Sequence, residues 1–192
     1  HAVGKKRDNS KSLAAIVASG VSDGMLVDVG LPFCLGGVLY NCRALLLDGR
    51  LLLIRPKTAL ADDLCYREGR WFTAWTPLRL ETVPLPAVLA DACGQSSAPF
   101  GDALLDLDDA TLGLEMCEEL WLPTPRHVMQ LAAGATLLAN GNGSHHEVHK
   151  QAARLAMLRG ATARGGAYLY ANLVGCDGGR MCFAGGHHDS PG

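Results

Sequence analysis

The residues best able to do chemistry lie where an apolar run meets a cysteine and two glutamates. Residues 111–116 predict a strand that runs directly into Cys117, and Glu118 and Glu119 then open a short helix. A cysteine at such a strand-to-helix elbow faces a ligand, and the free backbone N–H groups beside it favour a thiolate and a developing oxyanion. The pattern therefore predicts a nucleophilic thiol at Cys117. The alternative is a structural cysteine in the core, because cysteine is among the most often buried residue types.

A lysine and a glutamate are the candidate partners of this thiol. Lys57 follows a strongly apolar strand at 50–54, where a desolvated ammonium would stabilise a thiolate or an oxyanion. The alternative is a solvated lysine just past a strand end. Glu68 would orient Lys57, or it is a loop carboxylate that pairs with Arg67 or Arg70.

Three histidines, His145, His146 and His149, raise the question of a metal. Only His145 and His149 have ligand spacing, whereas a structural zinc site needs paired sets of histidine or cysteine. We therefore predict no metal, and we interpret the histidines as polar residues at a helix start near a pocket. The glycine-rich loop at 140–144 lacks the Gly-Lys-Ser/Thr of a phosphate loop, and its glycines instead allow close backbone approach to a small ligand.

The composition excludes several classes of protein. The 192 residues are 48% hydrophobic and 19% charged, which is typical of one globular domain. A net charge of −2 gives no general attraction to nucleic acid or to an anionic membrane, so we expect neither as a partner and predict a small polar substrate. Seven cysteines, an odd number, with no membrane-length apolar run and no signal-peptide pattern, predict a cytoplasmic location with free thiols.

Helices and strands alternate along the chain in a way that predicts a layered α/β fold. Asp48-Gly49, between two apolar runs, predicts a tight hairpin. The segment 62–101 reads as a long connection with one strand near 80–85. Other expected strands are 25–29, 38–47, 50–54, 103–107, 111–116, 136–139, 167–173 and 180–184; expected helices are 13–18 with Ser12 as N-cap, 125–133, and 147–164 with Val148, Ala152 and Leu155 on its apolar face.

The order of the motifs resembles a known family. It is similar to the glutaminase domain of eukaryotic-type glutamine-dependent NAD synthetases, which belongs to the nitrilase (carbon–nitrogen hydrolase) superfamily. The resemblance implies an α-β-β-α sandwich, incomplete at its N- and C-terminal edges, over residues 20–185, with tails at 1–19 and 186–192. The motifs that carry it are Tyr40-Asn41-Cys42-Arg43, Arg55-Pro56-Lys57, Tyr66-Arg67-Glu68 with Arg70-Trp71-Phe72, Pro99-Phe100-Gly101-Asp102, Cys117-Glu118-Glu119-Leu120-Trp121, Gly143-Ser144-His145-His146, and Ala171-Asn172 with Gly175-Cys176-Asp177-Gly178.

The resemblance also implies a set of site residues. The family uses a Glu-Lys-Cys triad, in which Cys117 matches the nucleophile and Lys57 the lysine, while Glu68 matches an additional carboxylate near the site. Lys57 and the backbone N–H of Glu118 would hold the oxyanion while a glutamyl thioester forms and ammonia leaves. The residues that match the groups binding the amino and carboxylate ends of glutamine are Tyr66, Glu118, Ser144 and Lys150.

The sequence departs from the family pattern in two places. No segment before Met25 resembles the Pro-Glu-Leu that carries the general-base glutamate, and the Ser-Gly-Gly phosphate motif of the synthetase domain occurs nowhere in these residues. The glutaminase step needs no cofactor, whereas ATP, Mg and deamido-NAD are implied for that absent domain. The implied partners are glutamine, the synthetase domain of the same full-length chain and further copies in a homo-oligomer. The alternatives are a catalytically silent fragment that acts as an interaction module and a nitrilase-type amidase for another amide.

Overall fold

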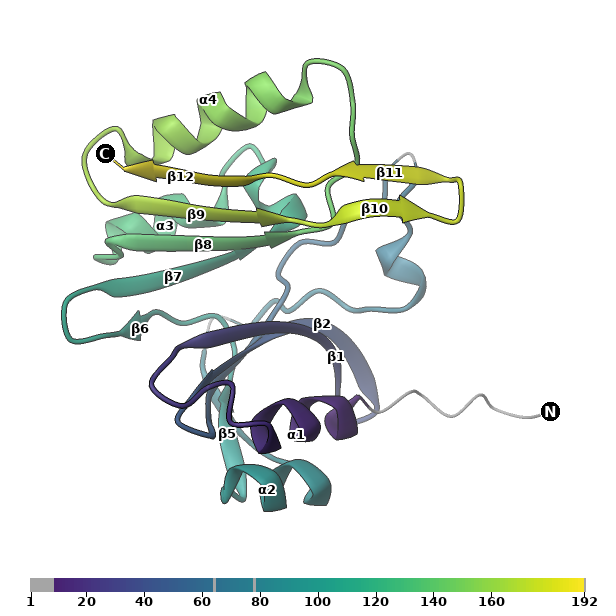
Figure 1. Cartoon of the computed structure of the whole chain (residues 1–192), viewed down its shortest axis with the longest axis vertical. Helices are drawn as coiled ribbons and strands as arrows, with labels where there is room; N and C mark the ends of the chain where they lie inside the picture. Colours follow the sequence, from purple (N-terminus) through teal and green to yellow (C-terminus); the bar gives the residue numbers. More distant parts are fainter. Residues whose placement is uncertain (1–8, 64, 78, 192) are drawn as a thin grey trace. The chain divides into compact units, whose positions relative to one another are not determined.

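The computed structural model describes residues 9–63, 65–77 and 79–191 (Figure 1). The chain divides into two compact units. Unit 1 contains the residues up to Thr58 together with Glu68–Asp102, and unit 2 contains Ala59–Arg67 together with Ala103–Gly192. The 35 residues Glu68–Asp102 of unit 1 thus separate the segment Ala59–Arg67 from the rest of unit 2.

Unit 1 is a five-stranded sheet with two helices. The strands lie in the order β1 (Val27–Leu35), β2 (Val38–Leu47), β3 (Arg50–Pro56), β5 (Ser97–Phe100) and β4 (Glu81–Pro84), antiparallel except for β3 with β5. Helices α1 (Ser10–Ala18) and α2 (Ala87–Cys93) contact each other. Their buried Leu13, Val17 and Leu89 join Leu46 and Phe100 of the sheet in one apolar core.

The β2–β3 hairpin brings Lys57 to the end of a buried strand. Asp48 and Gly49 have φ of 50° and 70°, which is the left-handed backbone of the tight turn expected from this dipeptide. β3 is buried along most of its length, including Ile54 and Arg55. Lys57 follows directly after its last residue, as predicted.

Unit 2 is a second five-stranded sheet, whose central strands are parallel. Its order is β12 (His187–Pro191), β9 (Ala167–Asn172), β8 (Leu137–Asn142), β7 (Thr111–Met116) and β6 (Leu105–Asp106). α3 (Arg126–Ala132) connects β7 to β8, and α4 (Lys150–Thr162) connects β8 to β9. Both helices cover the same face, where Leu131 and Leu158 join Leu138 and Tyr168 (Figure 1).

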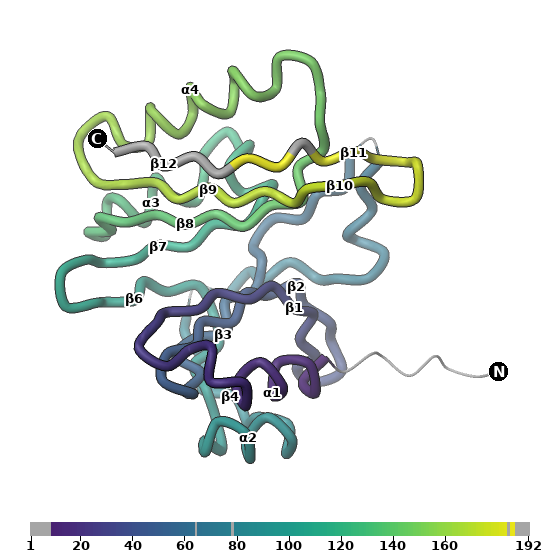
Figure 2. The backbone as a smooth tube through the Cα atoms, in the orientation of Figure 1, coloured from purple at the N-terminus to yellow at the C-terminus, as the bar shows by residue number. Residues whose placement is uncertain are grey.

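The carboxyl ends of β7, β8 and β9 meet at one edge of this sheet, because the three strands are parallel and in register. Cys117 follows β7, Ser144 follows β8, and Asn172 ends β9. Beyond that edge the chain runs from β9 into β10 (Val174–Asp177), turns and returns as β11 (Met181–Ala184) (Figure 2).

These elements confirm an α/β fold, with local differences from the expectations. Helix α1 begins at Ser10, so Asn9 and not Ser12 occupies its N-cap position. The segment 62–101 contains α2 and β5 besides the expected strand, now β4. The expected apolar face of α4 is wrong: Val148 precedes the helix and is 75% exposed, Ala152 is exposed, and the buried face carries Arg154, Leu158 and Thr162.

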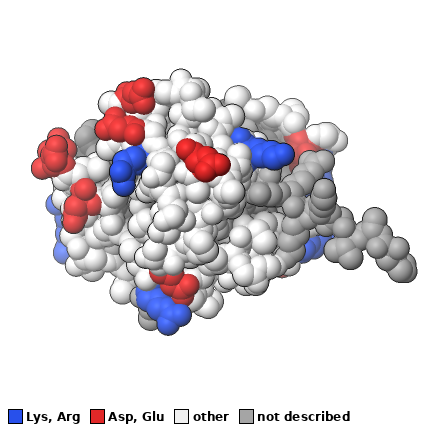
Figure 3. All heavy atoms as spheres, turned by 90° about the horizontal axis from the view of Figure 1, so that it is seen from below, with Lys and Arg blue, Asp and Glu red and all other residues white. Residues whose placement is uncertain are grey.

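No described helix combines the length and apolar character needed to cross a membrane. On the face of the molecule drawn in Figure 3, acidic and basic side chains are few and interspersed among uncharged ones.

Candidate active site

Cys117 occupies a strained turn at the end of β7. Its φ of 48° is positive, which among the described non-glycine residues is shared only by Asp48 and His149. Non-glycine residues avoid this region, so the surrounding contacts must hold the backbone there. The Cys117 N–H donates to Asn140 Oδ1 at 2.8 Å, and the N–H of Met116 donates to Glu119 Oε2 at 2.7 Å. Cys117 is half-buried rather than enclosed in the core, which favours a nucleophile over a structural cysteine.

A cavity of about 500 Å³ opens beside this cysteine, entirely within unit 2. Its size lies in the range of small-molecule sites, roughly 300–1,000 Å³. The cavity brings together five of the seven site residues expected from the sequence. Those five are Cys117, Tyr66, Glu118, Ser144 and Lys150.

Tyr66 fixes the loop after β8. Its hydroxyl donates to the carbonyl of Gly143 at 2.8 Å and accepts the N–H of His145 at 3.0 Å, and Nδ1 of the His145 ring lies 3.0 Å from the same oxygen. Burial raises the pKa of Tyr66 to about 12, against the opposing effect of the hydrogen bond from the His145 backbone. The phenol therefore keeps its proton at neutral pH.

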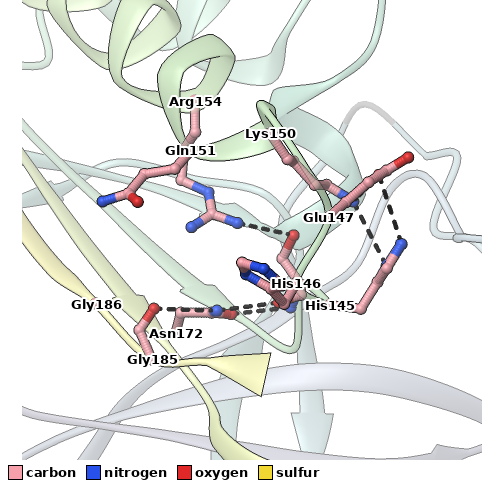
Figure 4. Close-up of a pocket in the computed structure, with 10 residues that line it drawn as sticks. His145, His146, Glu147, Lys150, Gln151, Arg154, Asn172, Gly185 and Gly186 are labelled. Carbon is pink, nitrogen blue, oxygen red and sulfur yellow. Dashed lines mark hydrogen bonds and ion pairs between the residues drawn. The ribbon is translucent and has the colours of Figure 1, made fainter. Parts of the chain in front are cut away.

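Ser144 is held from two sides, by Asn172 and Arg154, which Figure 4 labels. Its backbone N–H donates to Asn172 Oδ1 at 2.9 Å and its carbonyl accepts from Asn172 Nδ2 at 3.0 Å. Arg154 extends from α4 and donates from Nη2 to Ser144 Oγ at 3.1 Å, while its guanidinium lies 4.8 Å from the centre of the Tyr170 ring. A smaller cavity of about 100 Å³ lies beside these residues.

Lys150 supplies a cation that borders both cavities. Its Nζ lies 3.5 Å from Glu147 Oε2 and 3.5 Å from His145 Nδ1, and 5.6 Å from the centre of the Trp121 ring. An ammonium and a buried guanidinium in neighbouring positions suit a ligand that carries a carboxylate.

A buried polar network lies behind Cys117. Glu115 lies on β7 and uses both carboxylate oxygens. Its Oε1 accepts the backbone N–H of His127 at 2.5 Å and lies 3.0 Å from Nδ1 of the His127 ring. Its Oε2 accepts the Tyr168 hydroxyl at 2.5 Å. Asn140 Nδ2 donates to the Tyr168 oxygen at 3.0 Å, which connects the network to the Cys117 N–H.

Burial would raise the pKa of Glu115, but the hydrogen bonds and charge of His127 and the hydrogen bond of Tyr168 outweigh it, so the net shift is downward. Burial, and then the charge of Glu115, raises the pKa of Tyr168 well above its usual range. Glu115 therefore stays ionised and Tyr168 protonated at neutral pH.

Lys57 and Glu68 form an ion pair within unit 1. The Lys57 side chain is 2% exposed, and its Nζ lies 2.5 Å from Glu68 Oε2. Asn41 Nδ2 donates to the other Glu68 oxygen at 2.7 Å, and the Asn41 carbonyl accepts the Lys57 N–H at 2.7 Å. The alternative of a solvated lysine is therefore wrong, and Glu68 orients Lys57.

Among the described residues there is no group of three or more histidine, cysteine, aspartate or glutamate side chains placed to hold a metal ion. His145 instead contacts Tyr66 and Glu147, and the backbone N–H of His146 donates to the Cys182 carbonyl at 2.7 Å.

Comparison with known proteins decides the family. The profile of the family described as carbon–nitrogen hydrolase matches residues 7–187. The chain belongs to the carbon–nitrogen hydrolase family. The matched range includes α1 and is wider than the 20–185 expected from the motifs.

The relatives of this carbon–nitrogen hydrolase confirm the resemblance drawn from the motifs. It is 45% identical to the glutamine-dependent NAD(+) synthetase of Drosophila melanogaster and 43% identical to that of Homo sapiens. Each alignment extends over 175 residues, or 90% of this chain. It spans 22% and 25% of those proteins, about a quarter of their length.

Solved structures show the same fold. A glutamine-dependent NAD(+) synthetase from Cytophaga hutchinsonii superposes with a TM-score of 0.77 at 31% identity, which covers 93% of this chain and 28% of that one. A nitrilase-superfamily amidase from Nesterenkonia superposes with a TM-score of 0.68 at 18% identity over 95% of this chain and 58% of that one, a likeness of fold alone.

Sequence reasoning missed the residues that support the nucleophile and Ser144. Glu115 follows the apolar run 112–114 and Asn140 follows the apolar run 137–139, and a polar residue directly after such a run inside a strand is the signal that would have found them. Arg154 left no such signal, because an arginine in the middle of a helix ordinarily faces solvent.

Proposed function

We propose that this carbon–nitrogen hydrolase hydrolyses the side-chain amide of glutamine through a thioester on Cys117. The observation that carries the proposal is the Cys117 elbow, which opens on a cavity shared by Tyr66, Glu118, Ser144 and Lys150. The relatives at 43–45% identity support it, because each is named a glutamine-dependent NAD(+) synthetase.

The reaction takes two steps. The Cys117 sulfur attacks the amide carbon, its thiol proton passes to a base and on to the leaving nitrogen, and the C–N bond breaks to release ammonia. Water then attacks the glutamyl thioester, the C–S bond breaks, and glutamate leaves with the thiol restored. The backbone N–H of Glu118 stabilises the oxyanion in both steps, and the family resemblance implies the same role for the ammonium of Lys57. The role of Lys57 rests on the family resemblance and on its burial beside Glu68 in unit 1.

The cavity supplies groups for the other end of glutamine. The Lys150 ammonium suits the α-carboxylate, the Glu118 carboxylate suits the α-ammonium, and Tyr66 and Ser144 offer hydroxyls. In this assignment Arg154 acts through Ser144, to which it donates.

In a longer chain the released ammonia would serve the ATP-dependent amidation of deamido-NAD. We assign ATP, Mg and deamido-NAD to a synthetase domain outside these residues, so no step here passes through them. Assembly into a homo-oligomer and a cytoplasmic location stay predictions of the sequence.

Labelling with a diazoketone analogue of glutamine tests the proposal. We expect one adduct, mapped by peptide mass spectrometry to Cys117, which excess glutamine prevents and the Cys117→Ala variant lacks. Cys34→Ala is the matched control, because Cys34 is an exposed cysteine of unit 1 and its loss should leave the adduct unchanged.

Two results would contradict the proposal. Labelling spread over the exposed cysteines without protection by glutamine would indicate an unassembled site, as in a silent interaction module. Release of ammonia from simple amides but not from glutamine would indicate an amidase of another specificity.

A further inference from the structure

Two cysteines that play no part in the proposed reaction face each other across the β10–β11 hairpin. Cys176 on β10 and Cys182 on β11 are directly opposite in the antiparallel register. Their sulfurs lie 3.4 Å apart, both side chains are exposed, and both are free thiols. The hydrogen bond and then the charge of Cys182 raise the pKa of Cys176 above its usual value.

The backbone already has the separation that a disulfide needs. Residues directly opposite in an antiparallel pair have Cα atoms about 4.5–5.5 Å apart, within the roughly 4.4–6.8 Å that disulfides span. Closing the bond therefore requires movement of the two sulfurs rather than of the strands. The turn that joins them contains Gly178 and Gly179 at φ of 52° and 77°, a backbone that glycine adopts without strain.

The inner side of the same hairpin contacts two segments that line the cavity beside Cys117. The Cys182 carbonyl accepts the His146 N–H at 2.7 Å, which connects β11 to the loop of Ser144. Buried Met181 places Sδ 3.2 Å from Cys65 Sγ, and Arg180 Nη1 donates to the Cys65 carbonyl at 3.3 Å, next to Tyr66. These contacts connect the hairpin to this side of the cavity.

We propose that Cys176 and Cys182 are a redox modification site, at which a low-molecular-weight disulfide such as oxidised glutathione closes a reversible bond that stiffens the support of the Ser144–His146 loop. One cysteine thiolate attacks the small disulfide, forming a mixed disulfide and releasing one thiol. The second thiolate attacks the protein sulfur of that mixed disulfide, the Cys176–Cys182 bond forms, and the second small thiol leaves. The protein loses two hydrogens, and the small disulfide gains them.

Tryptic mapping without reduction tests the bond, because cleavage after Arg164 and Arg180 places the two cysteines on separate peptides, 165–180 and 181–192. After treatment of the full chain with oxidised glutathione we expect these peptides as one cross-linked species, lighter than their sum by about 2 Da and separated by dithiothreitol. Cys176→Ser and Cys182→Ser should each abolish it, and Cys34→Ser should not. Absence of the species, or a bridge from Cys182 to Cys65, would overturn the proposal.

Hydrogen exchange tests the stiffening independently of any activity. Oxidation should slow exchange of the His146 amide by roughly threefold or more. The β2–β3 hairpin of unit 1 should exchange equally in both forms. A cross-link that leaves His146 exchange unchanged would refute the mechanical coupling.

We expect the rate at which the glutamine analogue labels Cys117 to differ between the reduced and the oxidised protein. This expectation rests on the proposed function. Equal rates would refute that consequence. If Cys117 is unlabelled in both forms the proposed function fails, whereas the cross-link and exchange results still decide the redox site.

Discussion

The side-chain amide oxygen of Asn140 accepts the backbone N–H of Cys117 at 2.8 Å, at a residue held in left-handed backbone conformation. Asn140 is 2% exposed and also contacts Tyr168, so its amide cannot rotate freely. The direction of the nucleophile is thus set from the neighbouring strand, β8, rather than by Cys117 itself.

Replacement of Asn140 should therefore change the chemical step more than binding. Asn140→Ala removes the acceptor, and we expect kcat for glutamine to fall by roughly tenfold or more with little change in KM. Asn140→Asp keeps an acceptor but adds a negative charge near the sulfur, so the pH profile of Cys117 alkylation should move to higher pH. Unchanged profiles in both variants would show that Asn140 has only a structural role.

Glu115 should make the free energy of unfolding depend on pH in the acidic range. The pKa of Glu115 is lower in the folded protein than the ordinary carboxyl value of 4.5. Its contribution to the free energy of unfolding is therefore complete above pH 4.5 and is lost as the pH falls through the folded pKa. Glu115→Gln should cost about 2 kcal/mol at pH 7, with a smaller cost at pH 3. Urea midpoints at several pH values measure this, and an equal cost at both pH values would contradict the ionised state of Glu115.

The Lys57–Glu68 pair should behave as a coupled unit. Glu68→Gln leaves a buried ammonium without its carboxylate, and we expect a loss of roughly 2–4 kcal/mol in unfolding free energy. The double variant Lys57→Met/Glu68→Gln should recover part of that stability, yet glutamine hydrolysis should stay at least about a hundredfold below wild type because the oxyanion loses its cation. Additive losses of stability would show that the pair is not coupled.

Tyr66 should matter for substrate binding and not for the alkaline limb of the pH profile. Tyr66→Phe removes the contacts to Gly143 and His145, so the Ser144 loop loosens and KM should rise by roughly tenfold, more than kcat falls. Because the pKa of Tyr66 is raised to about 12, any alkaline limb below pH 10 should survive in the variant. Loss of that limb would mean that Tyr66 titrates in the working range.

The sequence predicts the structure best where the types of the residues and their spacing indicate the same element. Strand 111–116 was predicted with its observed bounds, and Cys117 lies at the expected elbow because an apolar strand cannot continue into two glutamates. α2 was missed because prolines at 84 and 86 obscure a helix of seven residues, too short for a clear period. On α4, the buried position of Arg154 depends on the Tyr170 ring and the Ser144 hydroxyl, which tertiary packing alone brings to it.

The path of the chain through unit 2 determines when during synthesis the cavity beside Cys117 can form. Tyr66 is synthesised with unit 1, but its hydroxyl has partners only after Gly143 and His145 have left the ribosome, about 80 residues later. Contacts of such long sequence separation form slowly, because the intervening chain must be ordered first. The Tyr66 side of the cavity thus forms only after the loop that follows β8 has been synthesised. A nascent chain that ends before β8 contains the nucleophile but lacks the substrate cavity.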